Sequence, residues 1–203
     1  MRAGSSDAAI FSPRSLAALN RRLLATPPPA SFSARIVPGE GPIGARLALV
    51  GEQPGDQEDQ VGRPFVGPAG AILDRAMSEA GLQRAETYVT NAVKAFKFRQ
   101  VGKRRIHQSP SAGDVKHYRW WLEQELAFVR PGLAVALGAT AALALCGRKV
   151  AVTRARGPAL FGDQPGYITV HPSSLLRVRD PHARQVAFAA FVEDLARAKA
   201  LTA

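Results

Sequence analysis

Cysteine is almost absent from this sequence. Cys146 is the single one among 203 residues, so the chain cannot form an internal disulfide, a zinc ribbon or a metal cluster held by cysteines alone. Long apolar runs are missing too, because the longest one, residues 133–146, is shorter than the roughly 20 residues of a membrane-spanning helix. Asp7 stands where a signal peptide needs an apolar segment. We therefore expect a cytoplasmic protein with no membrane partner.

Acidic residues are also scarce, since 16 Asp and Glu stand against 27 Lys and Arg and leave a net charge of +11. Such an excess favours a polyanionic partner. Residues 94–119 carry +7 of it, because eight basic residues there face one acidic residue, Asp114. A charge run is usually a solvated face, but Phe96 and Phe98 interrupt this one with rings that can stack on bases. We expect a nucleic-acid groove here.

The apolar pattern indicates one domain, because hydrophobic residues make up 46% of the chain. Prolines 27–29 set off a short helical pattern, so we take residues 1–34 as an N-terminal arm and residues 35–203 as the single domain. Four continuous apolar runs, at 47–50, 88–89, 133–137 and 167–170, are typical of strands buried on both faces. Segments with helical periodicity separate them. This alternation predicts a layered α/β domain with a four-stranded, mostly parallel sheet.

Each apolar run leads into a polar or glycine-rich segment. The sequences GEQPGDQED, TNAVK, GATAA and HPSS follow the four runs in order. The motifs of phosphate loops, serine hydrolases and zinc proteases are absent. Because the carboxyl ends of parallel strands line one crevice, we expect these four segments to converge and form the functional site.

Three of these segments resemble a known enzyme family. Residues 51–70 (GEQPGDQEDQVGRPFVGPAG), 88–94 (YVTNAVK) and 171–177 (HPSSLLR) resemble the motifs of family 4-type uracil-DNA glycosylases. The insert KRRIHQ at residues 103–108 resembles the UdgX class of that family. The resemblance implies an α/β/α sandwich with a central parallel sheet and excision of uracil from DNA. For the UdgX class it also implies a covalent bond between a histidine and the emptied sugar.

The chain departs from this family in the ligands of its 4Fe–4S cluster. The resemblance places those ligands in the N-terminal region, just after the TNAVK lysine, and on a helix. Here the arm has no cysteine, Ala95 follows Lys94, and Tyr118 stands at the helix position. Ala and Tyr cannot replace thiolates, so we expect no cluster, no other cofactor and no metal. The side chains expected to pack in its place are Phe32, Tyr118, Trp120 or Trp121.

The resemblance also assigns a uracil pocket. Asn91 would pair with the imide edge, Phe65 would stack on the base, and His171 would donate to the uracil oxygen that gains negative charge. Gln53 and Asp56 would hold the pocket floor through backbone and side-chain groups. Four of these residues have an ordinary alternative: a turn cap for Asn91, a core ring for Phe65, a helix cap for Asp56 and a structural role for His171.

DNA contacts are expected from the basic stretch and from the segment after His171. SSLLRVR resembles the wedge that keeps a flipped base out of the strand, with serines on phosphate and Leu175, Leu176 or Arg177 in the gap. The expected DNA contacts are Lys94, Lys103, Arg104, Arg105, Ser173, Ser174, Leu175 and Arg177.

His107 ends KRRIH and is the expected nucleophile, with Glu52 accepting its other proton. The expected catalytic residues are thus His107, Glu52, His171, Gln53 and Asp56. We expect a monomeric, single-turnover uracil-DNA glycosylase that prefers single-stranded DNA, releases uracil and, in a bacterium, associates with the nucleoid. Two alternatives stay open: a turnover glycosylase in which Glu52 or Asp56 positions water and His107 only binds DNA, and a non-catalytic single-strand binder that uses the basic stretch.

Overall fold

The computed structural model describes residues 13–202. Its main sheet has five strands in the order β3-β2-β6-β8-β7, which are Tyr88–Asn91, Leu47–Gly51, Leu133–Leu137, Gln164–Thr169 and Gly157–Phe161. The first four pair in parallel, as the continuous apolar runs predict, and three of them are buried along their whole length. The fifth, β7, joins antiparallel at an edge with alternating exposure. The predicted α/β fold is confirmed, with one strand more than expected.

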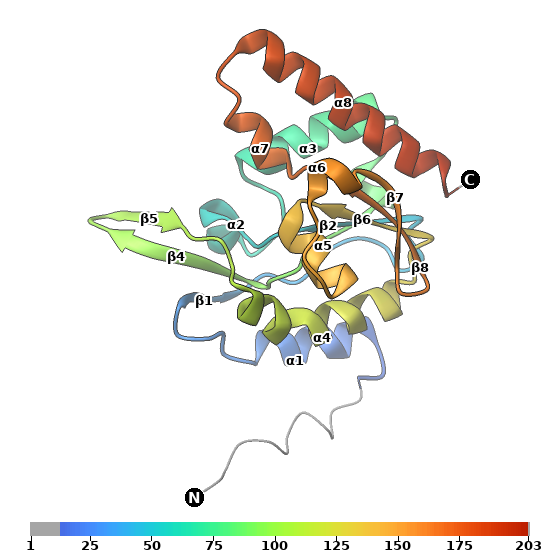
Figure 1. The fold of residues 1–203 in the computed structure, drawn as a ribbon. Helices are drawn as coiled ribbons and strands as arrows, with labels where there is room; N and C mark the ends of the chain where they lie inside the picture. The colour runs from blue at the N-terminus through green and yellow to red at the C-terminus, as the bar shows by residue number, and fades with distance from the viewer. Residues whose placement is uncertain (1–12, 203) are drawn as a thin grey trace, which may run out of the picture.

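Helices cover both faces of the main sheet (Figure 1). On one face, α3 (Pro68–Glu79), α7 (Pro172–Leu176) and α8 (Pro181–Ala200) pack together. On the other face lie α4 (Ala112–Val129) and α5 (Ala139–Cys146), with α1 (Leu16–Leu24) against α4. Two apolar cores fill the spaces between these layers, one centred on Leu73 and Phe191 and the other on Leu122 and Ala141. The molecule is therefore a three-layer sandwich.

A second, antiparallel sheet was not expected from the sequence. Its order is β1-β4-β5, which are Phe32–Ile36, Ala95–Val101 and Arg104–His107. The β4–β5 hairpin extends from the body of the molecule (Figure 1), with Gly102 and Lys103 at its tip and His107 paired with Phe98 near its root. Phe96 is only 1% exposed and stacks on Phe98 with ring centroids 5.4 Å apart. The expectation that Phe96 stacks on bases is therefore wrong, because core packing covers its ring.

The expected arm is only partly described, since residues 1–12 lie outside the described residues. Ser15 caps α1 by accepting from the Ala18 amide, and Leu19 and Leu23 are buried. The expected boundary at residue 34 falls inside β1, which pairs with β4. The described part of the arm thus packs onto the domain.

Three short helices complete the described chain: α2 (Asp56–Val61), η1 (Arg84–Glu86) and α6 (Val152–Ala155). Within residues 13–202, every helix is too short or too polar to cross a membrane. The last helix, α8, begins at Pro181, and Asp180 is its N-cap and accepts from the Ala183 amide.

Candidate functional site

The carboxyl ends of four parallel strands bring the expected segments together. Glu52 follows β2, Asn91 ends β3, Thr140 lies in the first turn of the helix after β6, and His171 follows β8. The Thr140 hydroxyl donates to Glu52 at 2.6 Å. A Cβ on Gly138 would lie 2.9 Å from the Cβ of His171, so the turn after β6 touches the segment after β8. The segments predicted to converge at the strand ends therefore do lie together, and we call this group of strand-end residues the crevice.

Asn91 presents a buried polar atom without a partner. The residue is 2% exposed, and its Oδ1 has no hydrogen-bond partner among the described residues. A Cβ on Gly51 would lie 2.4 Å from this Oδ1 and 2.4 Å from the Phe65 ring, so only glycine lets Asn91 and Phe65 approach each other. An unpaired buried acceptor costs about 1–3 kcal/mol. A ligand N–H that reached Asn91 would recover that energy.

Phe65 is held in a strained backbone conformation, with φ at +54° and 5% of the residue exposed. A Cβ on Gly70 would lie 1.9 Å from the Phe65 carbonyl oxygen, so the following helix start needs glycine there. Arg84 donates to the carbonyls of Pro64 at 2.6 Å and Phe65 at 3.3 Å. The ring faces His171 at a centroid distance of 5.9 Å. Strain fixed by its surroundings is typical of functional sites.

Glu58 closes the loop that carries Phe65. Its carboxylate is buried and accepts from the Gly55 amide at 3.0 Å and the Gly67 amide at 2.9 Å. Sequence reasoning missed both Glu58 and Arg84. Glu58 can bond both amides only because the chain reverses direction between residues 55 and 67. In the sequence, an acidic residue at the start of a helix does not indicate this reversal.

His171 is a neutral hydrogen-bond donor. Burial lowers its pKa to about 4, although the nearby Glu52 carboxylate acts in the opposite direction. As the N-cap of α7, its Nδ1 accepts from the Ser173 amide at 3.2 Å and lies 2.8 Å from the Ser173 hydroxyl. Because Nδ1 accepts, the ring proton sits on Nε2. At neutral pH the crevice thus contains an uncharged N–H donor beside Phe65.

Glu52 and His107 form a pair at the root of the hairpin. The distance between Glu52 Oε1 and His107 Nε2 is 3.2 Å, with His107 half exposed and Glu52 three-quarters covered. Burial opposes ionisation of Glu52, but hydrogen bonds from His107 and Thr140 outweigh it and hold its pKa below the usual value. The pair therefore joins an ionised carboxylate to an imidazole at the edge of the crevice.

Gln53 and Asp56 both contact the β4–β5 hairpin. The Gln53 amide donates to the carbonyls of Lys97 at 3.3 Å and Gln108 at 3.1 Å, and accepts from the Lys97 amide at 3.1 Å. Asp56 is 45% exposed and accepts from Arg105. Backbone groups at the hairpin root thus occupy the Gln53 side-chain amide, and the role of Gln53 and Asp56 at the pocket floor stays a prediction.

Lys94 does not contact DNA as expected. Its side chain is fully buried and donates to Glu125 and Thr90. Burial lowers the pKa of Lys94, while Glu125 acts against that shift. The expectation is wrong because the ammonium group joins β3 to α4 inside the core, where no phosphate can reach it.

Half of the eight basic residues at positions 94–119 have acidic partners. Arg105 pairs with Asp56 and Asp59, so among the expected DNA contacts it also serves to hold the hairpin. The other pairs are Lys94–Glu125, Lys97–Asp114 and Arg119–Glu123. The other four of the eight, Arg99, Lys103, Arg104 and Lys116, are exposed and have no acidic partner among residues 13–202. The charge free to meet phosphate there is smaller than the sequence count suggests.

The α7 segment also differs from expectation. Leu175 is 3% exposed and packs in the core, so it cannot act as a wedge, whereas Leu176 is 51% exposed and Arg177 is exposed. The Ser174 hydroxyl donates to the His171 carbonyl at 2.7 Å. Ser173 and Ser174 therefore hold His171, and a phosphate would have to compete for their hydroxyls.

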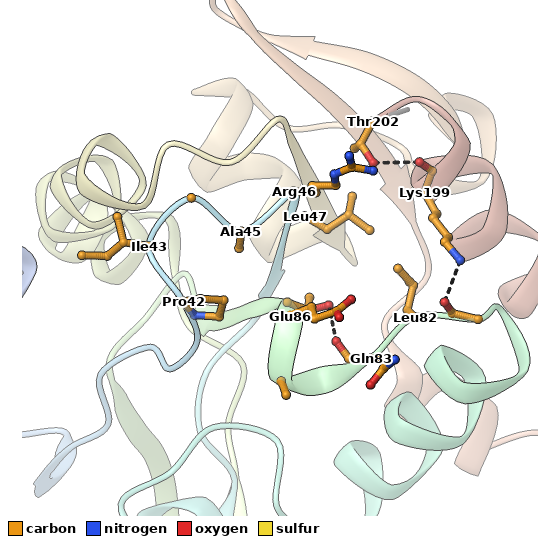
Figure 2. A pocket seen from close by; sticks show the side chains of 14 residues that line it. Pro42, Ile43, Ala45, Arg46, Leu47, Leu82, Gln83, Glu86, Lys199 and Thr202 are labelled. Atoms are coloured by element: carbon orange, nitrogen blue, oxygen red, sulfur yellow. Dashed lines mark hydrogen bonds between the residues drawn. The ribbon is translucent and has the colours of Figure 1, made fainter.

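A cavity of about 750 Å³ lies at the amino ends of the parallel strands, on the side of the main sheet away from the crevice (Figure 2). It is lined by parts of residues 42–47 and 81–87 with Lys199 and Thr202, next to the beginnings of β2 and β3. None of the expected site residues lines it. We therefore place the candidate site at the crevice and not in this cavity.

The fold and the crevice define an α/β sandwich with a histidine–carboxylate pair near the carboxyl ends of its parallel strands. Residues 38–196 match the Uracil DNA glycosylase superfamily, and the chain belongs to that superfamily. It is 35% identical over 167 residues to a type-4 uracil-DNA glycosylase of Thermotoga maritima, with 81% of each chain covered. A type-4 uracil-DNA glycosylase of Pyrobaculum aerophilum is 34% identical over 150 residues, which cover 70% of this chain and 73% of the relative.

The positions expected for cluster ligands do not fit a thiolate-ligated cluster. Ala95 and Tyr118 are buried, and the Tyr118 ring meets the edge of Phe32 at a centroid distance of 6.0 Å. Trp121 packs against the same core, whereas Trp120 is 37% exposed. In residues 13–202 no three His, Cys, Asp or Glu side chains gather closely enough to hold a metal.

Proposed function

We propose that this protein excises uracil from DNA and then bonds His107 to C1′ of the emptied sugar. Membership of the Uracil DNA glycosylase superfamily and the names of the type-4 relatives support the excision step. One observation carries the capture step: His107 Nε2 lies 3.2 Å from the ionised Glu52, beside the crevice that contains Asn91 and His171. An imidazole with one nitrogen on a carboxylate keeps a lone pair on the other nitrogen.

Recognition of uracil follows from the groups in the crevice. The unpartnered Asn91 Oδ1 accepts the imide N–H, and the Phe65 ring covers the face of the base. His171 donates its Nε2–H to a uracil oxygen. Donors fixed before the reaction stabilise the charge that develops as the bond breaks.

Bond breaking and capture are separate steps. The C1′–N1 bond breaks with its electron pair leaving on uracil, which departs as an anion held by His171 and later takes a proton from water. The sugar is left as an oxocarbenium ion, and the free lone pair of His107 forms the N–C1′ bond. The imidazolium then shares its remaining N–H with Glu52, which compensates its charge. One adduct forms per protein, so the reaction is a single turnover.

We further propose that single-stranded DNA is the preferred substrate and that the protein works as a monomer without an iron–sulfur cluster. The exposed cations Lys103 and Arg104 near the hairpin tip support contacts with a single strand. The half-buried position of Cys146 at the end of α5, and the packing of Phe32 on Tyr118, support the cluster-free state.

The substitution His107→Ser tests the capture step. It removes the imidazole and leaves room for water to reach C1′ from the same side. Incubated with a uracil-containing oligonucleotide, the unchanged protein should give a retarded protein–DNA band on a denaturing gel. The variant should release uracil and leave an alkali-labile abasic site without that band.

The gel also separates the alternatives. A band that survives in His107→Ser means that another residue is the nucleophile. Alkali-labile product without any band from the unchanged protein means a turnover glycosylase. Binding on native gels alone, with no uracil released, means a non-catalytic single-strand binder.

A further inference from the structure

Thr140 lies beside the crevice but has no role in the proposed steps of bond breaking and capture. It lies in the first turn of α5, two residues after Gly138, the N-cap of that helix. Gly138 has φ at +93°, its amide donates to the Thr169 carbonyl at 2.9 Å, and a Cβ there would meet His171. The turn is thus fixed against the strand that leads to His171. The backbone that carries Thr140 is therefore held in a fixed position.

The Thr140 hydroxyl reaches Glu52, which directly follows β2, the strand next to β6 in the main sheet. It donates to Glu52 Oε2 at 2.6 Å, between residues 88 positions apart in the sequence. The opposite oxygen, Oε1, faces His107 Nε2 at 3.2 Å. Both oxygens of one carboxylate are therefore assigned, one to a fixed hydroxyl and one to the imidazole.

Fixing one oxygen fixes the other. A carboxylate held at a single oxygen can swing about its side-chain bonds, whereas a second anchor sets the plane of the group. The β-branched threonine has a restricted χ1 angle, so it holds its hydroxyl at little entropic cost. The hydroxyl is also a short, charge-assisted donor, and such bonds are stronger than neutral ones.

We propose that Thr140 is a positioning residue, whose hydroxyl holds the Glu52 carboxylate aimed at His107 during capture of the sugar. This inference rests on the proposed function. Thr140 touches neither uracil nor the sugar in this assignment and acts through Glu52 alone. It therefore governs capture and not the departure of uracil.

The test replaces Thr140 by valine, which has the same shape without the hydroxyl. Single-turnover capture and uracil release are measured in parallel across a pH series. Loss of a hydrogen bond to a charged group should slow capture about tenfold at mildly acidic pH. Because the Thr140 bond lowers the pKa of Glu52, the acid limb of the capture profile should move to higher pH. The charged or titratable groups that face Glu52 are His107 and His171, and both stay unchanged in the variant.

Two control variants show whether the effect comes from the Thr140 hydroxyl in particular. Thr140→Ser restores a hydroxyl and should restore the position of the acid limb. Thr87→Val removes a hydroxyl that donates to the Gln83 carbonyl at 2.9 Å, at the far edge of the sheet, and should leave the limb unmoved. Thermal unfolding of each variant identifies any loss of folded protein.

A double-mutant comparison decides whether Thr140 acts through Glu52. In a Glu52→Gln background, Thr140→Val should add no further loss of capture. Additive losses, or an acid limb that does not move in Thr140→Val, would overturn the inference. Absence of any covalent complex with the unchanged protein would instead overturn the proposed function, so the two failures are distinguishable.

Discussion

His171 obtains its chemical character from neighbouring backbone groups. The amide at the start of α7 occupies Nδ1, and burial lowers the pKa of the ring to about 4. The same ring in a solvated loop would be protonated over much of the range between about pH 4 and 6.5. A motif such as HPSS therefore identifies the residue, while its protonation state depends on the folded surroundings.

This shift predicts how stability depends on pH. Between about pH 6.5 and 4 the unfolded chain binds a proton at His171 and the folded chain does not, so stability falls as pH falls through this window. The size of this contribution is up to about 3 kcal/mol. His171→Asn, which can still cap α7, should remove it. Urea unfolding of both proteins at several pH values measures the difference, and parallel pH dependences would contradict a neutral His171.

Residue identities predicted which groups gather at the crevice but not how each is used. Gln53 and Lys94 stand in expected motifs, yet one binds the hairpin root and the other is buried against Glu125. Leu175 and Leu176 are adjacent leucines, of which one is core and one is exposed. Such differences depend on partners far away in the sequence, and no local pattern reports those partners.

At the scale of elements, the β4–β5 hairpin (residues 95–107) connects the basic surface to the site. Arg105 pairs with Asp56 and Asp59 of α2, and the Gln53 amide bonds the backbone at the root. These contacts fix His107, which lies two residues after Arg105. Continuous apolar runs predicted the parallel strands, because both faces of those strands are buried. The hairpin was missed because its exposed, basic face resembles a solvated loop.

The hairpin tip predicts the salt dependence of DNA binding. If Arg104 neutralises a phosphate, Arg104→Glu should lower the slope of log affinity against log salt by about 0.7 for single-stranded DNA. Arg46→Glu is the matched control, since Arg46 is exposed beside the cavity at the amino ends of the parallel strands (Figure 2). Fluorescence anisotropy at several salt concentrations gives both slopes. Equal slopes for the two variants would place the DNA path away from the hairpin.

At the scale of the whole molecule, one buried ion pair ties the main sheet to the helical layer. Lys94 lies between β3 and β4, and its partner Glu125 on α4 also accepts from Thr90 at 2.8 Å and the Gly39 amide at 2.9 Å. Three donors thus meet at the Glu125 carboxylate. The buried Glu125 carboxylate is tolerated here because an ammonium group, a hydroxyl and a backbone amide all donate hydrogen bonds to it.

Removing one member of this pair should be costly. Lys94→Met leaves Glu125 as an unpaired buried charge and should lower the free energy of unfolding by about 3–5 kcal/mol. In Lys94→Met/Glu125→Gln the remaining amide oxygen can still accept from Gly39, so much of that loss should return. Urea titrations of the three proteins measure this. A double variant as unstable as the single one would show that packing of the lysine stem, and not the charge, is responsible.

The core beneath the hairpin predicts a protein that is stable without metal. Ala95 and Tyr118 are buried where the family resemblance would require thiolates, and Phe32 packs edge-on against Tyr118 at 6.0 Å. Thiolates hold iron–sulfur clusters, and Cys146 is the single cysteine of the chain.

The purified protein should therefore be colourless and contain no stoichiometric iron, and strong chelators should change neither its melting temperature nor its uracil release. Tyr118→Ala offers the complementary measurement: it should lower the free energy of unfolding by about 3–5 kcal/mol, as loss of a large core side chain does. Stoichiometric iron, with a visible absorbance band that chelation removes together with stability, would contradict the assignment and would require ligands other than cysteine.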